Sequence, residues 1–380
     1  MSLPPPPNPY GGQTPYGGQP PYGGQPQWVG QQPGAGGGQF SGPPPWGPPP
    51  SKGGKGKWIL GGVIVLLVIA LAVTVTILVT RDGSNGNSPM PPGDGQASEF
   101  ASANDTGPVN IITEDPTCDA WGRIGRDYAA ELETIEWAER DRSIPATAWT
   151  PAQKTMYENA AKAMVTATNH AANLSQQTPH RVMSALYAQF IAYTESFSDR
   201  IPAYDSADDE VLAVSDAVGS AISNICSSID FGSAIALAPL VDAPAGPTDI
   251  TNSSDSVSPK RFLEGANPVC GDWQTAADRF SVDTADWLAI DAKIPASDWT
   301  PEQRSINEIV GPTMTASADD LDRMSRRSSN PVFEDFGVLA AQYRRAYALS
   351  LPSYTAADGF LSQSAAFLVK TIVWACKASK

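Results

Sequence analysis

The chain has 380 residues and a net charge of −15, from 40 acidic and 25 basic side chains. No acidic residue precedes Asp82, so all of the negative charge belongs to the part of the chain that follows. A surface of this kind repels phosphate groups, which excludes nucleic acid as a partner.

The N-terminal region, residues 1–57, has the composition of a disordered segment. Its first 50 residues contain 16 Pro and 13 Gly and no charged side chain. Such a sequence cannot bury enough apolar surface to offset its chain entropy. Two roles fit this tail: the proline runs are read by a protein partner in an extended helix, or the tail is only a spacer. A Pro-Tyr-Gly-Gly-Gln unit recurs at Pro9–Gln13, Pro15–Gln19 and Pro21–Gln25.

Residues 58–80 are the most apolar stretch of the chain. They carry no charge, and 23 residues in a helix span roughly 34 Å, enough to cross a bilayer core. Lys52, Lys55 and Lys57 precede the stretch, whereas Arg81 alone follows it before Asp82. By the positive-inside rule the N-terminus is cytoplasmic and the C-terminal part lies outside the cytoplasm.

Two other interpretations of this stretch fit less well. A cleaved signal peptide has a shorter apolar core near the N-terminus. A buried core helix of this length usually keeps a polar face. The sequence therefore predicts a retained transmembrane helix at 58–80 and a single-pass plasma-membrane protein. Residues 81–116, rich in Gly, Ser, Asn and Pro, are then a flexible stalk.

Beyond the stalk the sequence repeats itself with an offset of 150 residues. The segment Ile144–Gln153 (IPATAWTPAQ) returns as Ile294–Gln303 (IPASDWTPEQ). Trp137 matches Trp287 at the same offset. The domain prediction is a helical repeat at 117–229, a linker at 230–268 and a second helical repeat at 269–380.

Each repeat has the pattern of four helices. In the first helix of repeat one, apolar residues recur at helical spacing, and in each repeat a Thr-Pro-x-Gln capping box opens the second helix. Thr178-Pro179 and Asn330-Pro331 predict the start of a third helix, and Pro202 and Pro352 its end. We therefore predict an all-α ectodomain of two tandem duplicated four-helix bundles. The stripe of repeat one's first helix is Trp121, Ile124, Tyr128, Leu132 and Ile135.

All four cysteines lie in the predicted ectodomain, where an even number favours disulfides. In an up-down-up-down bundle the start of the first helix and the end of the fourth lie at the same end. Cys118 and Cys226 hold these two places in repeat one, and Cys270 and Cys376 hold them in repeat two. We predict the pairs Cys118–Cys226 and Cys270–Cys376.

No catalytic constellation emerges from the sequence. Serine-hydrolase, zinc-protease, phosphate-loop and calcium-loop motifs are missing, and the two histidines, His170 and His180, have no counterpart in the other repeat. We therefore predict no catalytic residue, no metal ligand, no cofactor and no enzymatic activity.

Two repeated aromatic pairs are the candidate ligand-binding residues: Trp149 with Trp299, and Tyr204 with Tyr354. Aromatic side chains in loops can line a pocket for a sugar or lipid chain. The favoured alternative for Trp149 is a hydrophobic staple, because an aromatic residue directly before the Thr150 cap can pack on the first helical turn.

The Pro/Gly/Tyr/Gln tail, the Lys-flanked span, the stalk and a cysteine-bracketed helical module with Ile-Pro-Ala-x-x-Trp-Thr-Pro together resemble the proline-rich single-pass membrane proteins of mycobacteria and related actinobacteria. This resemblance implies a location in the cell envelope and transfers no functional residue.

The predicted function is that of a non-catalytic envelope scaffold or adaptor, which links a cytoplasmic tail to an extracytoplasmic helical interaction domain. Its expected partners are the bilayer, through 58–80, and proteins at the tail and ectodomain. The alternatives are a ligand-binding or sensing ectodomain for an envelope lipid or glycan, and an envelope enzyme. No oligomeric state is predicted.

Overall fold

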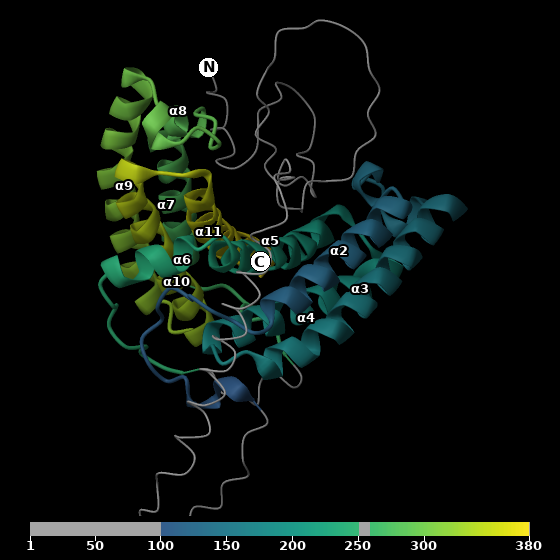
Figure 1. Ribbon diagram of the computed structural model, residues 1–380. Coiled ribbons are helices and arrows are strands. Elements are labelled where there is room, and N and C mark those ends of the chain that lie inside the picture. The colour runs from purple at the N-terminus through teal and green to yellow at the C-terminus, as the bar shows by residue number, and fades with distance from the viewer. Residues whose placement is uncertain (1–99, 251–258, 380) are drawn as a thin grey trace, which may run out of the picture. The chain divides into compact units, whose positions relative to one another are not determined.

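The computed structural model describes residues 100–250 and 259–379, and every regular element among them is a helix (Figure 1). The all-α prediction is confirmed for this part of the chain. The predicted tail at 1–57, the predicted transmembrane helix at 58–80 and residues 81–99 of the predicted stalk lie outside the described residues. Residues 100–116 of that stalk are described, and Val109, Ile111 and Ile112 among them are buried in the hydrophobic core rather than forming a free linker.

The first half contains four long helices in succession. They are α2 (Cys118–Thr134), α3 (Pro151–Gln177), α4 (Arg181–Arg200) and α5 (Asp209–Asp230). Each packs against the next in the chain, and α2 also contacts α5. A short 3₁₀ turn at Ser206–Asp208 precedes the fourth helix.

The second half follows the same order. Its helices are α7 (Cys270–Asp283), the short α8 (Ala285–Leu288), α9 (Pro301–Arg326), α10 (Pro331–Ser350) and α11 (Gly359–Ala378). The 3₁₀ turns of the described chain are η1 (Ala101–Asn104), η2 (Trp137–Glu139), η3 (Ala146–Ala148), η4 (Ile201–Ala203), η5 (Ser206–Asp208), η6 (Ala238–Leu240), η8 (Ala296–Asp298), η9 (Leu351–Ser353) and η10 (Ala356–Asp358).

The capping boxes are present where the sequence predicts them. The Thr150 hydroxyl accepts a hydrogen bond from the Gln153 amide at 3.2 Å, and the Gln153 side chain accepts one from the Thr150 amide at 2.9 Å. Thr300 and Gln303 repeat this exchange at 3.2 and 3.0 Å. Each box satisfies two backbone donors that the first turn of a helix leaves unpaired, which fixes where α3 and α9 begin.

The two halves share one hydrophobic core. The most extensive helix–helix contact in the described chain joins α5 to α11, and the buried residues of both halves form one connected cluster. In two bundles with separate cores, each fourth helix would be buried only by its own bundle. Here the two fourth helices, α5 and α11, also pack against each other. Their fully buried residues include Val214, Val218, Ile222, Leu361, Leu368 and Ile372.

This mutual packing accounts for the apolar character of the two helices. The segments Ser206–Asp230 and Ala356–Ala378 are long and apolar enough to cross a membrane by length and composition. More than half of the most apolar window in each, 61% and 56%, is nevertheless buried within the protein. Core helices of soluble proteins have the same property, so the segments are weak evidence for a membrane span.

The connection between the halves contains a short helix, α6 (Ser233–Leu237). It contacts α5 of the first half and also α10 and α11 of the second. The apolar run Ile235–Val241 spans the end of α6 and the 3₁₀ turn after it, and both of these elements contact α10 of the second half. Ile235 itself remains 63% exposed.

Both predicted disulfides are present. Cys118 at the start of α2 is bonded to Cys226 near the end of α5, with Cα atoms 5.3 Å apart. Cys270 at the start of α7 is bonded to Cys376 near the end of α11, with Cα atoms 5.6 Å apart. Each bond closes one half of the described chain, as the predicted bundle topology requires.

Candidate functional site

The four candidate aromatic residues lie in two matching corners, one in each half. In the first, the rings of Trp149 and Tyr204 are stacked with centroids 5.6 Å apart; in the second, Trp299 and Tyr354 are stacked at 5.7 Å. The structure thus brings Trp149 to Tyr204 and Trp299 to Tyr354, and it does not bring the two pairs to a common site.

Backbone hydrogen bonds position both corners in the same way. The Trp149 indole donates to the Ile144 carbonyl at 2.9 Å, and the Trp299 indole donates to the Ile294 carbonyl at 3.0 Å. The carbonyl of each tyrosine accepts a bond from the loop alanine, Ala146 or Ala296, at 2.9 and 2.8 Å. These bonds hold each tryptophan ring against its tyrosine and fix the loop that carries it.

The first corner is filled from within. Tyr157, on the second turn of α3, stacks on Trp149 with ring centroids 4.0 Å apart and is only 1% exposed. The staple prediction placed the contact of Trp149 on the first turn of α3; the main aromatic partner instead comes from the second turn. Arg140 lies over the ring of Trp137, 3.9 Å from its centroid.

A buried ion-pair cluster closes the same corner. The Arg140 guanidinium is 3.3 Å from one oxygen of Asp209, and the Arg142 guanidinium is 3.6 Å from the other. The Tyr204 hydroxyl donates to the Arg142 carbonyl at 2.9 Å. The aromatic and charged side chains pack against one another in the corner beside Trp149.

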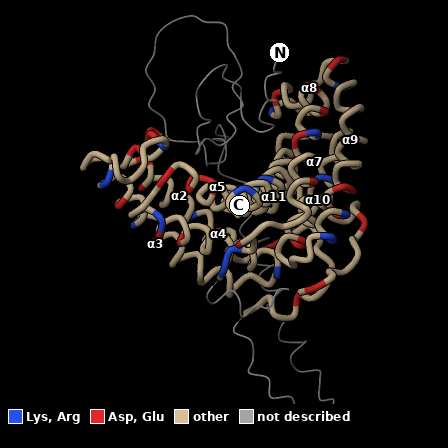
Figure 2. Tube along the Cα trace, turned by 180° about the vertical axis from the view of Figure 1, so that it is seen from behind, with Lys and Arg blue, Asp and Glu red and all other residues tan. Residues whose placement is uncertain are grey.

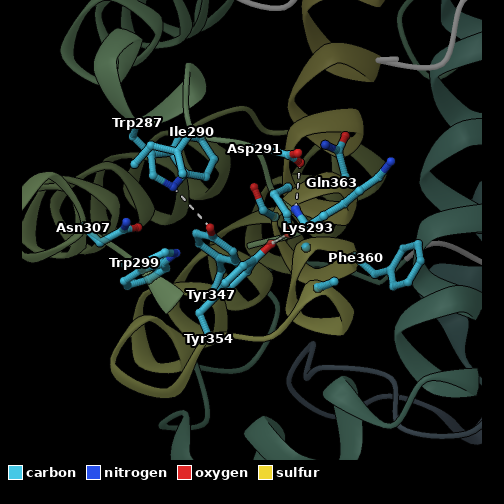
Figure 3. A pocket seen from close by; sticks show the side chains of 14 residues that line it. Trp287, Ile290, Asp291, Lys293, Trp299, Asn307, Tyr347, Tyr354, Phe360 and Gln363 are labelled. Carbon is cyan, nitrogen blue, oxygen red and sulfur yellow. Dashed lines mark hydrogen bonds between the residues drawn. The ribbon is translucent and has the colours of Figure 1, made fainter. Parts of the chain in front are cut away.

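The second corner contains a pocket of about 230 Å³ (Figure 3). Trp299 and Tyr354 line it, as the sequence suggested, together with Trp287 and Tyr347. The Trp287 indole donates to the Tyr347 hydroxyl at 3.2 Å, and the Tyr354 hydroxyl donates to the Ala292 carbonyl at 2.6 Å. The pocket is also lined by Ile290, Asp291, Ala292, Lys293, Asn307, Gly359, Phe360 and Gln363.

Trp287, Tyr347 and Asn307 are pocket residues that the sequence reasoning missed. The match of Trp287 with Trp137 marks it as part of the repeat, but that pattern gives no reason to place it beside Trp299. The edge-to-face contacts of Tyr347 with Trp287 and Tyr354 depend on how α10 approaches the loop that follows α8, which is a long-range property.

The tyrosines of this pocket are neutral hydrogen-bonding groups at ordinary pH. Burial, with the nearby Asp358 and Asp291 carboxylates, raises the pKa of Tyr354, and burial is likewise the main cause of the raised pKa of Tyr347. The pocket therefore offers aromatic faces and phenol hydroxyl groups and no phenolate nucleophile.

Several charged side chains outside the two corners form ion pairs with one another. Asp320 pairs with Arg279 and Arg323, and Asp319 pairs with Arg345. Figure 2 shows basic and acidic positions scattered along the helices of both halves. Among the described residues, no group of three or more His, Cys, Asp or Glu side chains could hold a metal ion.

A second hollow, of about 360 Å³, lies over α2 and α3 and includes the exposed His170 among its lining residues. It contains none of the candidate aromatic residues. His180 lies elsewhere, with its ring nitrogen 2.8 Å from the Glu114 carbonyl. The two histidines therefore form no common site.

The charged cluster of the first half leads to a pH prediction at Asp216 on α5. Burial raises the pKa of this carboxyl to about 6; Arg140 and Arg142 lower it, and Asp209 raises it further. Because the folded pKa exceeds the unfolded value of about 3.9, the protonated group stabilises the fold below about pH 4, and this stabilisation is lost as the pH rises through about 6.

We expect Asp216→Asn to remove the loss of folding stability that the wild type shows as the pH rises through about 6. Relative to the wild type, the variant should gain on the order of 1–3 kcal/mol in unfolding free energy between pH 4 and pH 7. Urea unfolding at four pH values across this window measures the difference, with Asp127→Asn at an exposed position of α2 as the control. Parallel pH curves for the wild type and Asp216→Asn would contradict the prediction.

Comparison with known proteins places this chain among mycobacterial sequences. A family model described as mycobacterial ESX-1 associated protein matches residues 100–380. An uncharacterised protein of Mycolicibacterium smegmatis (strain MKD8) is 40% identical over 328 residues, which cover 85% of this chain and 86% of that protein. No solved structure matches the chain.

Proposed function

The chain belongs to the family of mycobacterial ESX-1 associated proteins, and from this premise we propose that it is a non-catalytic scaffold or adaptor of a mycobacterial secretion apparatus. In this proposal, residues 58–80 anchor it as a single-pass protein in the plasma membrane, with a disordered cytoplasmic tail. The two halves are a tandem duplication of a four-helix bundle and lie outside the cytoplasm.

The observation that carries the proposal is the pair of disulfides, Cys118–Cys226 and Cys270–Cys376. Disulfides persist in oxidising compartments and are rare in the cytosol, so they favour an extracytoplasmic position for residues 100–380. The apolar stretch 58–80 and the lysines before it give the matching orientation.

The similarity to the Mycolicibacterium smegmatis protein extends into the region before residue 100. Its 328 aligned residues cover 85% of this chain, which is longer than the segment 100–380 that the family model matches. Part of the similarity therefore precedes residue 100, in the region that contains the proposed stalk and anchor.

Reporter fusions in mycobacterial cells test the topology. Alkaline phosphatase, which is active only outside the cytoplasm, should be active when fused after Lys380 and inactive when fused after Lys57. Activity in the opposite pattern would refute the proposed orientation, and equal activity from both fusions would refute the single span.

Crosslinking in native cells tests the adaptor role. The full-length chain, recovered under denaturing conditions after crosslinking, should carry envelope proteins of the secretion apparatus that a variant ending at residue 99 does not carry. Recovery of the same proteins by both chains would remove the helical part from the proposed function.

A ligand-binding or sensing ectodomain is the second candidate, and the pocket of about 230 Å³ beside Trp299 is the observation that favours it. In the first half the Tyr157 ring is stacked on Trp149, so the second half is the better place for such a site. An envelope lipid or glycan would then have to enter between Trp287, Trp299 and Tyr347 in Figure 3.

A further inference from the structure

The two aromatic corners match in sequence, but replacements at a few positions make them differ in volume. Tyr157 of the first corner corresponds at the offset of 150 to Asn307 of the second, where a small amide replaces the phenol ring. In the first corner that ring stacks on Trp149 at 4.0 Å. In the second, Asn307 lines the pocket beside Trp299.

Three further replacements enlarge the second corner. Ile290 stands where the first half has Arg140, Ala292 where it has Arg142, and Gly359 where it has Asp209. All three line the pocket. The ion-pair cluster that closes the first corner therefore has no counterpart at these positions, while the tryptophans and Tyr354 that form the walls are retained. A preserved aromatic wall without its filling ring is the feature that distinguishes the second half.

We propose that this second-half pocket binds an aromatic side chain of a partner polypeptide, which takes the place that Tyr157 occupies in the first half. The ring stacks on Trp299 beside Trp287 and Tyr347. The inference deepens the proposed scaffold function, because it names the chemistry by which a partner protein is held.

The size of the pocket supports a single side chain as its occupant. Sites for drug-sized molecules have volumes of about 300–1,000 Å³, whereas this pocket measures about 230 Å³. Buried aromatic anchors in small, well-packed pockets carry much of the binding energy at protein interfaces. The pocket therefore fits one anchoring ring better than a whole glycan or acyl chain.

The surroundings of the pocket support a polypeptide as the source of that ring. Asn307, Gln363, Asp291 and Lys293 supply amide and charged groups around the apolar walls, which can hydrogen-bond peptide groups next to the ring (Figure 3). Phe360 lines the pocket and stacks on Phe231, the residue after α5, at 5.0 Å.

Phe231 is 59% exposed, so apolar surface continues from the pocket toward the connection between the halves. A partner chain anchored by one ring would cover this continuation, whereas a free aromatic molecule would leave it in water. The exposed phenylalanine is thus a second reason to expect a polypeptide.

The test uses the full-length protein and a fluorinated probe, N-acetyl-4-fluorophenylalanine methylamide, followed by ¹⁹F NMR. A single ring with its peptide groups should bind with roughly millimolar affinity. The matched aliphatic probe, N-acetyl-5,5,5-trifluoroleucine methylamide, should bind at least about tenfold more weakly, because it cannot stack on the Trp299 ring.

The decisive variant is Asn307→Tyr, which restores the ring of the first half. It should weaken binding of the aromatic probe by at least about tenfold and leave the melting temperature unchanged or higher, since it fills a cavity. Asn169→Tyr, the same change at an exposed position of α3, should bind the probe as the wild type does. Unchanged binding in Asn307→Tyr, or equal binding of the two probes, would overturn the proposal.

If Asn307→Tyr lowers the melting temperature, Ile290→Arg gives an independent way to fill the pocket. This variant should also weaken binding of the aromatic probe. The pocket proposal and the scaffold proposal can fail independently of each other. If the pocket proposal fails, so that the wild type does not bind the aromatic probe, the reporter topology and the partners crosslinked to the wild type are unaffected. If the scaffold proposal fails, probe binding by the purified protein is unaffected. If both hold, Asn307→Tyr should also remove a crosslinked partner in cells.

Discussion

Replacing Cys118 and Cys226 together by serine is expected to lower the free energy of unfolding by about 4–5 kcal/mol. The bond joins residues 108 positions apart, and closing a loop of roughly 100 residues restricts the unfolded chain by about that amount on the loop-entropy model. The double variant Cys270→Ser/Cys376→Ser, with a separation of 106, should lose a similar amount. Urea unfolding under non-reducing conditions, followed by circular dichroism, measures both.

The reduced wild type is the control for these variants. Reduction should lower its stability at least as far as either double variant, whereas reductant should change each double variant only through its remaining bond. A double variant as stable as the oxidised wild type would show that the disulfide does not constrain the unfolded chain.

The number of unfolding transitions tests whether the two halves unfold as one unit. Cys226 belongs to α5 and Cys376 to α11, and these two helices share one core. Loss of either bond should therefore shift a single cooperative transition of residues 100–379. Two resolved transitions, with only one half affected by each variant, would mean that the halves fold as separate bundles.

The sequence predicted those features that depend on a few neighbouring residues or on residues at matching places in the two repeats. Thr150 and Thr300 precede Pro and, three residues on, Gln, which is enough to predict the capping boxes. The cysteines bracket each repeat, which is enough to predict their pairing from bundle topology. These inferences need only residue order and the geometry of one helix or one bundle.

The shared core could not be derived from the same signals. Val214, Val218 and Ile222 recur at helical spacing along α5, but Leu212 and Ala213 beside them are buried as well. Apolar residues on more than one face of a helix indicate burial on several sides. They do not identify the element that covers the additional side, which here is α11.

The pocket was partly predictable. Trp299 and Tyr354 were identified because both recur in the repeat, and recurrence is visible in one sequence. The pocket itself depends on what fails to recur, namely the loss of the Tyr157 ring at Asn307. A difference between matched positions acquires meaning only once the structure shows that Tyr157 fills the corner.

The contact between Arg181 and Asp335 had no sequence signal at all. The two residues are 154 positions apart, and neither belongs to a motif. The Arg181 guanidinium donates to both carboxylate oxygens of Asp335, each at 2.9 Å. It also donates to the backbone carbonyl of Asp105 at 2.6 Å. One side chain on α4 thus connects the segment before α2 with α10 of the other half.

Asp335→Ala is expected to lower the free energy of unfolding by about 3–5 kcal/mol. The side chains of Arg181 and Asp335 are only 6% and 1% exposed, and breaking a buried pair typically costs that much. The variant leaves the guanidinium with the partly exposed Asp105 carboxylate, 3.7 Å away, as its remaining ionic partner. Urea unfolding at neutral pH measures the loss. Lys154→Ala, which breaks the exposed pair with Glu158 on α3, should change the stability by less than about 0.5 kcal/mol.

The double variant Arg181→Met/Asp335→Leu separates the energy of the ion pair from the penalty of an unpaired charge. Burial, with Glu334 and Asp105, raises the pKa of Asp335 although Arg181 lowers it, whereas the pKa of Arg181 is raised because its acidic neighbours outweigh its own burial. The desolvation that is not offset therefore falls on the carboxylate. Removing both charges should therefore recover most of the stability that Asp335→Ala loses. If the double variant is as unstable as Asp335→Ala, the charged pair itself holds the two halves together, and the cost does not come from the charge left behind.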